Sequence, residues 1–233
     1  MQRQHDPARD KERFAAAKQQ LHTNVVGDIL DSLGLYDQFL RPELRPVQHD
    51  AVLIGRAMTV LEIDAPFASF EDAHNATVAQ PFGMMFEALD SLKENEVYVC
   101  TGASPRFALW GELMSTRAAV LGAAGAVVDG YSRDTRAVAN HPFPVFSHGS
   151  YGQDQGARGK VVDYRVPIRM GNVWINPGDI IFGDIDGVLV VPQQVEDEVF
   201  AKAMEKVSGE NVVRNALTAG LSTVEAYKHY GIM

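Results

Sequence analysis

The chain has 233 residues, of which 46% are hydrophobic and 22% are charged, and this composition is typical of folded globular proteins rather than disordered or collagen-like chains. Its formal net charge of −9 disfavours nucleic acid as a general partner, because an acidic surface repels phosphate backbones. No apolar run approaches the roughly 20 residues that span a bilayer, so we expect no membrane partner. The N-terminal segment has no apolar signal core, and the single cysteine, Cys100, cannot form an internal disulfide. Both features favour the cytoplasm.

The N-terminal segment 1–20 consists mostly of polar helix formers and is predicted to be a mobile or docking arm. From Thr23 onward, apolar residues recur at helical spacing as far as Leu33, and Gly34 ends the run. We therefore predict a helix over this run, with Thr23 or Asn24 as its N-cap.

Strands and helices alternate in the first half of the chain, and strands cluster in the second half. Predicted strands cover 51–63, 96–101, 124–130, 143–147, 160–170 and 172–192, and predicted helices cover 83–93, 111–121, 194–219 and 223–229. This mixture favours an α/β layered sandwich over a plain doubly wound sheet. The predicted organisation is an N-terminal arm (1–20), one α/β domain (21–192) and a C-terminal helical arm (193–233). The last arm is expected to pack on the domain or on a neighbouring subunit.

The segment 109–136 carries the strongest chemical signal. Gly111 precedes a predicted helix, so the backbone N–H groups of Leu113 and Met114 have no acceptors within that helix. Such a helix N-terminus binds carboxylates and phosphates well. We therefore expect an anion site here.

A short strand and a turn then return the chain, and we expect Arg133 and Asp134 to face Glu112 and this helix end. A fixed cation and two carboxylates beside free amides suit an anionic substrate held together with Mg²⁺ or Mn²⁺, which prefer oxygen ligands and retained water. The alternative interpretation is a solvated Arg-Asp surface pair, with Glu112 in a favourable dipole interaction at its helix end.

Other types of site have weaker support. A single Cys and seven scattered His residues form no zinc pattern, and no dinucleotide or P-loop glycine motif occurs. A Schiff-base lysine on an apolar strand is not apparent, because Lys160 borders a predicted loop.

Several blocks of the chain, in the same order, resemble the RraA-like proteins, which include the metal-dependent 4-hydroxy-4-methyl-2-oxoglutarate / 4-carboxy-4-hydroxy-2-oxoadipate aldolases. The resemblance covers roughly residues 20–231. The blocks are TNVVGDILDSLG (23–34), ALWGELMSTRA (108–118), GAAGAVVDGYSRD (122–134), FPVFSHG (143–149), VPIRMGNVWINPGDIIFGDIDGVLVVP (166–192) and EKVSGEN (205–211).

The resemblance implies a β/β/α sandwich assembled as a homotrimer or homohexamer, with active sites between subunits. The aldolase branch carries an acid, twenty intervening residues and then Arg-Asp, which here are Glu112, Arg133 and Asp134. The regulator branch typically has glycine at the first place and an acid three residues beyond the Asp, where this chain has Ala137. These differences favour the enzyme branch. The aldolases usually carry Asp at the position of Glu112, so the added methylene is expected to shift the water that this side chain holds.

The resemblance also implies a metal site. Asp134 would bind Mg²⁺ or Mn²⁺ directly, and Glu112 would orient a water on that ion and assist catalysis. Glu210, on the C-terminal helix, would reach the metal waters of a neighbouring subunit.

The implied substrate is a small anionic 2-oxo acid. Its carboxylate would lie on the backbone of Gly111, Leu113 and Met114, and Arg133 would bind it and stabilise the enolate oxygen that forms on cleavage.

The resulting prediction is a divalent-metal-dependent class II aldolase that cleaves a 4-hydroxy-2-oxo acid to pyruvate and a second oxo compound, with oxaloacetate decarboxylation as a side activity. Two alternatives stay open, because a fold does not fix a function. One is a non-catalytic regulator or binding protein of the RraA type. The other is a different hydroxy-acid lyase on the same scaffold.

Overall fold

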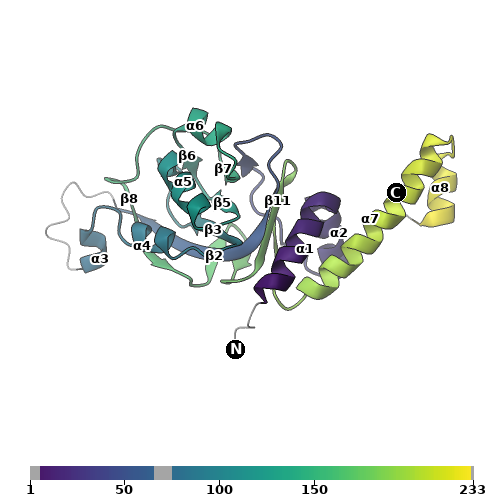
Figure 1. Ribbon diagram of the computed structural model, residues 1–233, viewed down its shortest axis with the longest axis horizontal. Helices are drawn as coiled ribbons and strands as arrows, with labels where there is room; N and C mark the ends of the chain where they lie inside the picture. Colours follow the sequence, from purple (N-terminus) through teal and green to yellow (C-terminus); the bar gives the residue numbers. More distant parts are fainter. Residues whose placement is uncertain (1–5, 66–74, 232–233) are drawn as a thin grey trace.

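The computed structural model describes residues 6–65 and 75–231, which form a mixed α/β fold with eight helices in the described residues (Figure 1). The main sheet has the strand order β1-β7-β5-β3-β2-β11-β12, and β8 also pairs with β2. Its strands are β1 (Arg45–Pro46), β2 (Leu53–Asp64), β3 (Glu96–Thr101), β5 (Gly125–Val128), β7 (Val145–Ser147), β8 (Gly159–Tyr164), β11 (Ile180–Asp184) and β12 (Gly187–Val191).

Two short strand pairs lie outside this sheet. They are β4 (Ala108–Trp110) with β6 (Tyr131–Ser132), and β9 (Ile168–Met170) with β10 (Val173–Ile175). The helices are α1 (Pro7–Gln20), α2 (Thr23–Ser32), α3 (Ala76–Ala79), α4 (Met85–Asp90), α5 (Glu112–Val120), α6 (Thr135–Asn140), α7 (Glu196–Thr218) and α8 (Thr223–Tyr230).

The centre of the main sheet is parallel, with β2, β3, β5 and β7 side by side, and it is covered on both faces. Successive side chains of a strand point to opposite faces. On β3, Tyr98 and Cys100 pack in one core with residues of α4 and α5, while Val97 and Val99 pack in another with residues of β9 and β10. This layering confirms the predicted β/β/α arrangement.

A third core lies beyond β11 and β12, where α1, α2 and α7 gather on one side of the molecule (Figure 1). Phe14, Leu30 and Phe200 belong to it. The N-terminal segment is therefore a docked helix where the structure describes it. The end of α7 and all of α8 extend away from the sheet (Figure 1). Within the described residues, no helix combines the length and the apolar character that crossing a membrane requires.

The predicted cap of the first periodic helix is wrong. The N-cap of α2 is His22, and the Thr23 hydroxyl and amide both donate to the Asp184 carboxylate, at 2.7 and 2.8 Å. Thr23 thus anchors α2 to the end of β11 instead of capping its own helix. The helix predicted over 83–93 is also shorter than expected, covering Met85–Asp90.

Candidate active site

Gly111 starts α5 and allows a close approach from a distant part of the chain. The Ser115 N–H donates to the Gly111 carbonyl at 3.1 Å, which is the first bond of the helix, and the Glu112 N–H donates to Asp134 Oδ2 at 3.2 Å. A Cβ on Gly111 would lie 2.8 Å from the same carboxylate oxygen. A side chain at this position would therefore push the Asp134 carboxylate away from the helix end.

The strand pair β4–β6 brings Arg133 and Asp134 to this place. Trp110 pairs with Ser132, and the Arg133 N–H donates to the Trp110 carbonyl at 2.9 Å. Asp134 has φ of 55°, the left-handed conformation that Asp tolerates better than most residues. It stands at the N-cap of α6, but its side chain makes no cap bond there and instead bonds the start of α5. The Asp134 side chain thus accepts a hydrogen bond at the start of α5 instead of capping α6.

Arg133 lies between two carboxylates. Its Nε is 3.7 Å from Asp134 Oδ2, and its Nη1 donates to Asp154 Oδ1 at 2.8 Å. The Arg133 side chain is 40% exposed, and those of Asp134 and Asp154 are each 45% exposed. The second Asp154 oxygen accepts the Gly156 N–H at 2.9 Å. The guanidinium is thus oriented by its neighbours while its surface remains open to a ligand.

These groups line one pocket of about 260 Å³, a size suited to a small organic acid. Five predicted residues meet in its wall, namely Gly111, Leu113, Met114, Arg133 and Asp134. The prediction missed other lining residues, which include Phe82, Met85, Phe86, Asp154 and Gln155.

The two remaining predicted acids do not line this pocket in the described chain. The Glu112 carboxylate turns along α5 and accepts the Thr116 hydroxyl at 2.8 Å, so that its backbone but not its side chain meets Asp134. Glu210 lies on α7, 4.0 Å from Lys206, and α7 packs beside α1 and α2, away from α5 (Figure 1). Their roles toward metal-bound water stay predictions.

The donor set fits only one kind of metal site. In the described residues no group of three or more His, Cys, Asp or Glu side chains converges, which disagrees with a closed, fully protein-ligated ion. The contacts of the half-exposed Asp134 carboxylate in that part of the chain involve Oδ2 alone. This arrangement fits a hard divalent ion bound through one carboxylate and otherwise by water or substrate oxygens, as Mg²⁺ accepts.

Lys160 is the second residue of β8 and borders a loop, as predicted, but its side chain is buried. Its ammonium group donates to the Gln80 carbonyl at 2.7 Å, and burial lowers its pKa. It does not line the candidate pocket.

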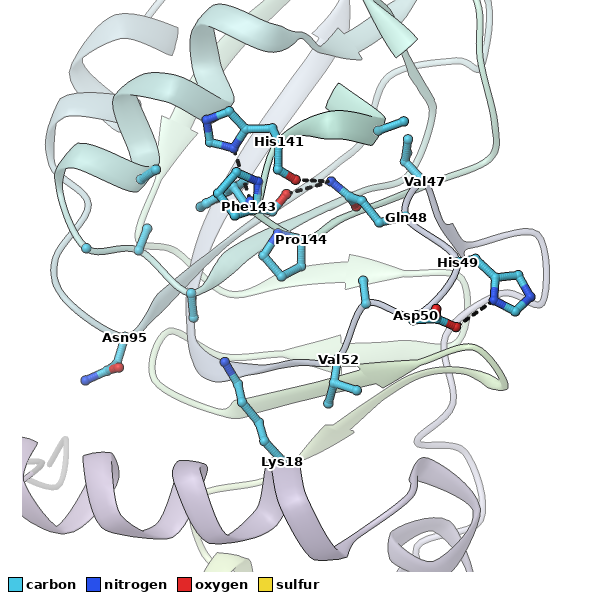
Figure 2. A pocket seen from close by; sticks show the side chains of 17 residues that line it. Lys18, Val47, Gln48, His49, Asp50, Val52, Asn95, His141, Phe143 and Pro144 are labelled. Carbon is cyan, nitrogen blue, oxygen red and sulfur yellow. Dashed lines mark hydrogen bonds and ion pairs between the residues drawn. The ribbon is translucent and has the colours of Figure 1, made fainter. Parts of the chain in front are cut away.

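A wider hollow of about 890 Å³ lies elsewhere, beneath the ends of α5 and α6 (Figure 2). Gln48 Nε2 donates to the backbone carbonyls of His141 and Phe143 at 3.2 and 2.9 Å, so this amide supports the surrounding loop. His49 pairs with the adjacent Asp50 in a fully exposed position. Lys18 points towards the hollow from α1 (Figure 2), and burial lowers its pKa. We favour the smaller pocket because its charged groups converge on one point.

The missed residues had weak sequence signals. Phe82 and Phe86 have the i, i+4 spacing of a shared helical face, which indicates packing but not which surface is hollow. Asp154 stands in a polar loop without any repeating pattern, and only the folded chain brings it to Arg133.

Comparison with known proteins finds a matching family model and a relative that is similar over most of the chain. A family model described as RraA-like, Aldolase/RraA, matches residues 23–190. A relative from Halalkalibacterium halodurans, named putative 4-hydroxy-4-methyl-2-oxoglutarate aldolase, is 32% identical over 205 residues, which cover 88% of this chain and 89% of the relative.

Two solved structures match almost the whole fold. An uncharacterized protein from Pseudomonas syringae pv. tomato is 27% identical, with a TM-score of 0.81 and 94% of both chains covered. A chain described among novel cellulases from microbes associated with the gut ecosystem is 30% identical, with a TM-score of 0.80 and coverage of 91% of this chain and 90% of that one.

Proposed function

Since this chain belongs to the RraA-like family, whose model matches residues 23–190, we propose that it is a divalent-metal-dependent lyase of the aldolase type. It cleaves a 4-hydroxy-2-oxo acid to pyruvate and a second oxo compound, and it decarboxylates oxaloacetate as a side activity. The relative named putative 4-hydroxy-4-methyl-2-oxoglutarate aldolase, 32% identical over 88% of this chain, supports the class of reaction.

One structural observation carries the proposal: Arg133 and Asp134 converge on the N-terminus of α5 in a single pocket. The substrate carboxylate lies on the first amides of α5, at Leu113 and Met114, because a helix N-terminus attracts anions. Arg133 is within reach of the same pocket and supplies a permanent positive charge.

The residues then have separate tasks in the reaction. Asp134 would hold the divalent ion, and the substrate's 2-oxo acid end would bind in the same pocket. When bound, Mg²⁺ or Mn²⁺ supplies a Lewis acid and a water of lowered pKa. Arg133 stabilises the oxygen on which negative charge develops as the carbon–carbon bond breaks, and preorganised donors of this kind are worth several kcal/mol. Asp154 keeps the Arg133 guanidinium in place through the 2.8 Å bond.

We also propose that the protein assembles as a homotrimer or homohexamer in the cytoplasm. The C-terminal arm extends from the sheet (Figure 1) and exposes Val212, Val224 and Tyr227, which suits packing against another copy. In such an assembly, Glu210 of one subunit approaches the pocket of the next.

A coupled assay for pyruvate tests the proposal, using a panel of 4-hydroxy-2-oxo acids and oxaloacetate with Mg²⁺, with Mn²⁺ and with chelator. The wild-type protein is expected to release pyruvate only with metal, and Asp134→Ala is expected to release none. Asp90→Ala, which removes an exposed acid paired with Arg117, is the control and should keep full activity. Full activity of Asp134→Ala would reject the site, and no pyruvate from any substrate with the wild-type protein would favour a binding protein.

A further inference from the structure

A second group of polar side chains lies where three neighbouring strands of the main sheet end. Thr101 is the last residue of β3, Asp129 directly follows β5, and His148 directly follows β7. These strands are parallel neighbours, so their carboxyl ends meet at one edge of the sheet. In open α/β sheets, ligands bind in the crevice outside the carboxyl ends of the strands. The position of this group in the fold therefore suits ligand binding.

Two arginines join the group around a hollow of about 340 Å³. Arg41 comes from the segment before β1, and Arg169 comes from β9. A Cβ added to Gly171 would lie 3.4 Å from Arg41 Nε, so the arginine lies against the turn between β9 and β10. Among the described residues, this hollow and the candidate active pocket share no lining residue, so the two are separate cavities.

The charges around this hollow favour an anion. Asp129 Oδ2 accepts the Thr101 hydroxyl at 2.7 Å, and Asp129 Oδ1 lies 3.9 Å from Arg41 Nη1. Burial acts to raise the pKa of Asp129, but His148, Thr101 and Arg41 lower it overall, so this side chain is a carboxylate at neutral pH. Two guanidiniums, which are always charged, line the hollow together with this one carboxylate. The hollow is therefore locally positive on a chain of net charge −9.

Buried polar atoms in the hollow also indicate a ligand. Asp129 Oδ1 and His148 Nε2 are 3.1 Å apart, and both are buried without an aligned hydrogen bond in the described part of the chain. Buried polar atoms are normally hydrogen-bonded to protein or to a bound molecule. The Arg41 side chain is 51% exposed, and Arg169 is exposed on β9. Buried polar atoms and accessible guanidiniums thus line the same hollow.

We propose that this hollow is a second binding site, which takes a small anion through a carboxylate or phosphate group. Arg41 and Arg169 bind the anion, because the planar fork of a guanidinium matches the oxygens of both groups. His148 supplies a ring nitrogen beside them. Every group named here belongs to a single chain, so the site does not depend on a residue from another subunit.

Calorimetric titration of the metal-free protein at pH 7 tests the proposal, with inorganic phosphate and malonate as the two probes. At least one probe is expected to bind the wild-type protein and Arg133→Ala alike, because Arg133 lies in the other cavity. Binding of phosphate alone would identify a phosphate ligand, binding of malonate alone a carboxylate ligand, and binding of both a site that accepts either group.

Matched variants locate the binding. Arg41→Ala and Arg169→Ala should each weaken it about tenfold, because hydrogen bonds between charged groups are the strong ones. Arg117→Ala is the control and should leave it unchanged, because Arg117 is a comparably exposed arginine (46%) outside the hollow. Unchanged affinity when Arg41 and Arg169 are both replaced, loss of binding in Arg133→Ala, or no binding of either probe would overturn the proposal.

Size-exclusion chromatography of the variant that lacks both arginines checks a competing role for the hollow, which is to receive an acidic side chain of another subunit. The proposal predicts an unchanged assembly. Dissociation of the assembly in this variant would show that the two arginines hold a neighbouring subunit, and would contradict the proposal.

This inference does not depend on the proposed lyase activity. If the protein binds the anion in this hollow but releases no pyruvate from any 4-hydroxy-2-oxo acid, the lyase assignment fails and the second site stands. If it releases pyruvate and binds neither probe, the second site fails alone.

Discussion

Arg56 and Arg133 each lie between two carboxylates, but one group of three is buried and the other is open. Arg56, on β2, contacts Asp10 of α1 and Glu196 of α7, and these three side chains are 8%, 7% and 5% exposed. Arg133 and its two partners are 40–45% exposed and line a pocket. The same set of charges therefore holds the helical arms together in one place and leaves a surface for a ligand in the other.

In the buried group around Arg56, burial and ion pairing have opposite effects on the pKa values of Arg56 and Glu196. Burial lowers the pKa of Arg56, but the hydrogen bonds and charges of Asp10 and Glu196 outweigh it and raise that pKa above its ordinary value. For Glu196 burial acts in the opposite sense, and the contacts with Arg56 and Arg13 lower its pKa overall. Loss of the Arg56 guanidinium would therefore leave the Asp10 carboxylate buried without this partner, whereas Glu196 would keep its contact with Arg13.

The largest effect on stability is expected for Arg56→Ala. It leaves two buried carboxylates without their common partner and should lower the free energy of unfolding by about 3–5 kcal/mol, measured by urea denaturation. Arg106→Ala, which breaks a pair in which the arginine is 70% exposed, is the control and should change it by less than about 0.5 kcal/mol. If Arg56→Ala lowers the free energy of unfolding by less than about 1 kcal/mol, the buried group around Arg56 does not contribute more to stability than the exposed group around Arg133.

Arg133→Ala should show the reverse behaviour. We expect kcat for pyruvate release to fall about 100-fold, because the guanidinium stabilises charge that develops during the reaction, while the free energy of unfolding stays within about 0.5 kcal/mol. Steady-state kinetics and urea denaturation check both parts. A raised KM with unchanged kcat would limit Arg133 to substrate binding.

Glu62 extends the comparison, because its side chain is buried and, among the residues that the structure describes, forms no ion pair with a cation. Its Oε1 has no hydrogen-bond partner in the described residues, and burial raises its pKa to about 8, against the opposing effect of the hydrogen bond with Cys100. Between about pH 4.3 and pH 8, the folded protein keeps a proton that the unfolded chain releases, so stability falls as pH rises. The contribution is about 1.4 kcal/mol between pH 6 and pH 7.

Glu62→Gln should remove this pH dependence. Urea denaturation at pH 6, 7 and 8 should show the variant gaining stability relative to the wild type as pH rises. A constant difference across that range would mean that Glu62 is ionised in the folded protein.

The smallest effect on stability is expected for Asp154→Asn. Exposed ion pairs contribute about 0–1 kcal/mol, so the free energy of unfolding should change by less than about 0.5 kcal/mol. Asp10→Asn, which changes the equivalent carboxylate of the buried group, should cost several times more. Equal losses in the two variants, measured under the same conditions, would show that exposure does not separate the two groups.

Much of the fold follows from local patterns. The strand Glu96–Thr101 matches its predicted bounds, and α5 differs from prediction by one residue at each end, because apolar runs and glycines mark both. The short elements β4, β6 and α6 have too few residues to show a period. The cap at Thr23 was wrong because Asp184, 161 residues away, competes for its hydroxyl.

In the site, too, local sequence patterns predicted some features, and contacts between distant parts of the chain were missed. The spacing from Gly111 to Asp134 predicted that Asp134 lies close to the start of α5, and the pairing of β4 with β6 brings these two segments together. Gly111 alone was enough to predict where this helix begins. The position of Asp154 depends on the conformation of its loop, and the apolar side of the pocket, which includes Phe82 and Phe86, depends on packing between α4 and α5. Neither feature produces a pattern that can be recognised in the local sequence. The sequence also did not indicate that the Glu112 carboxylate turns towards Thr116.

The most direct test of the central claim is a crystal structure of the protein grown with Mn²⁺ and oxalate, a planar dianion shaped like the enolate of pyruvate. We predict an anomalous manganese peak at the Asp134 carboxylate, with oxalate between Arg133 and the first amides of α5. Manganese away from Asp134, or oxalate in the hollow beside Gln48 (Figure 2), would contradict the account.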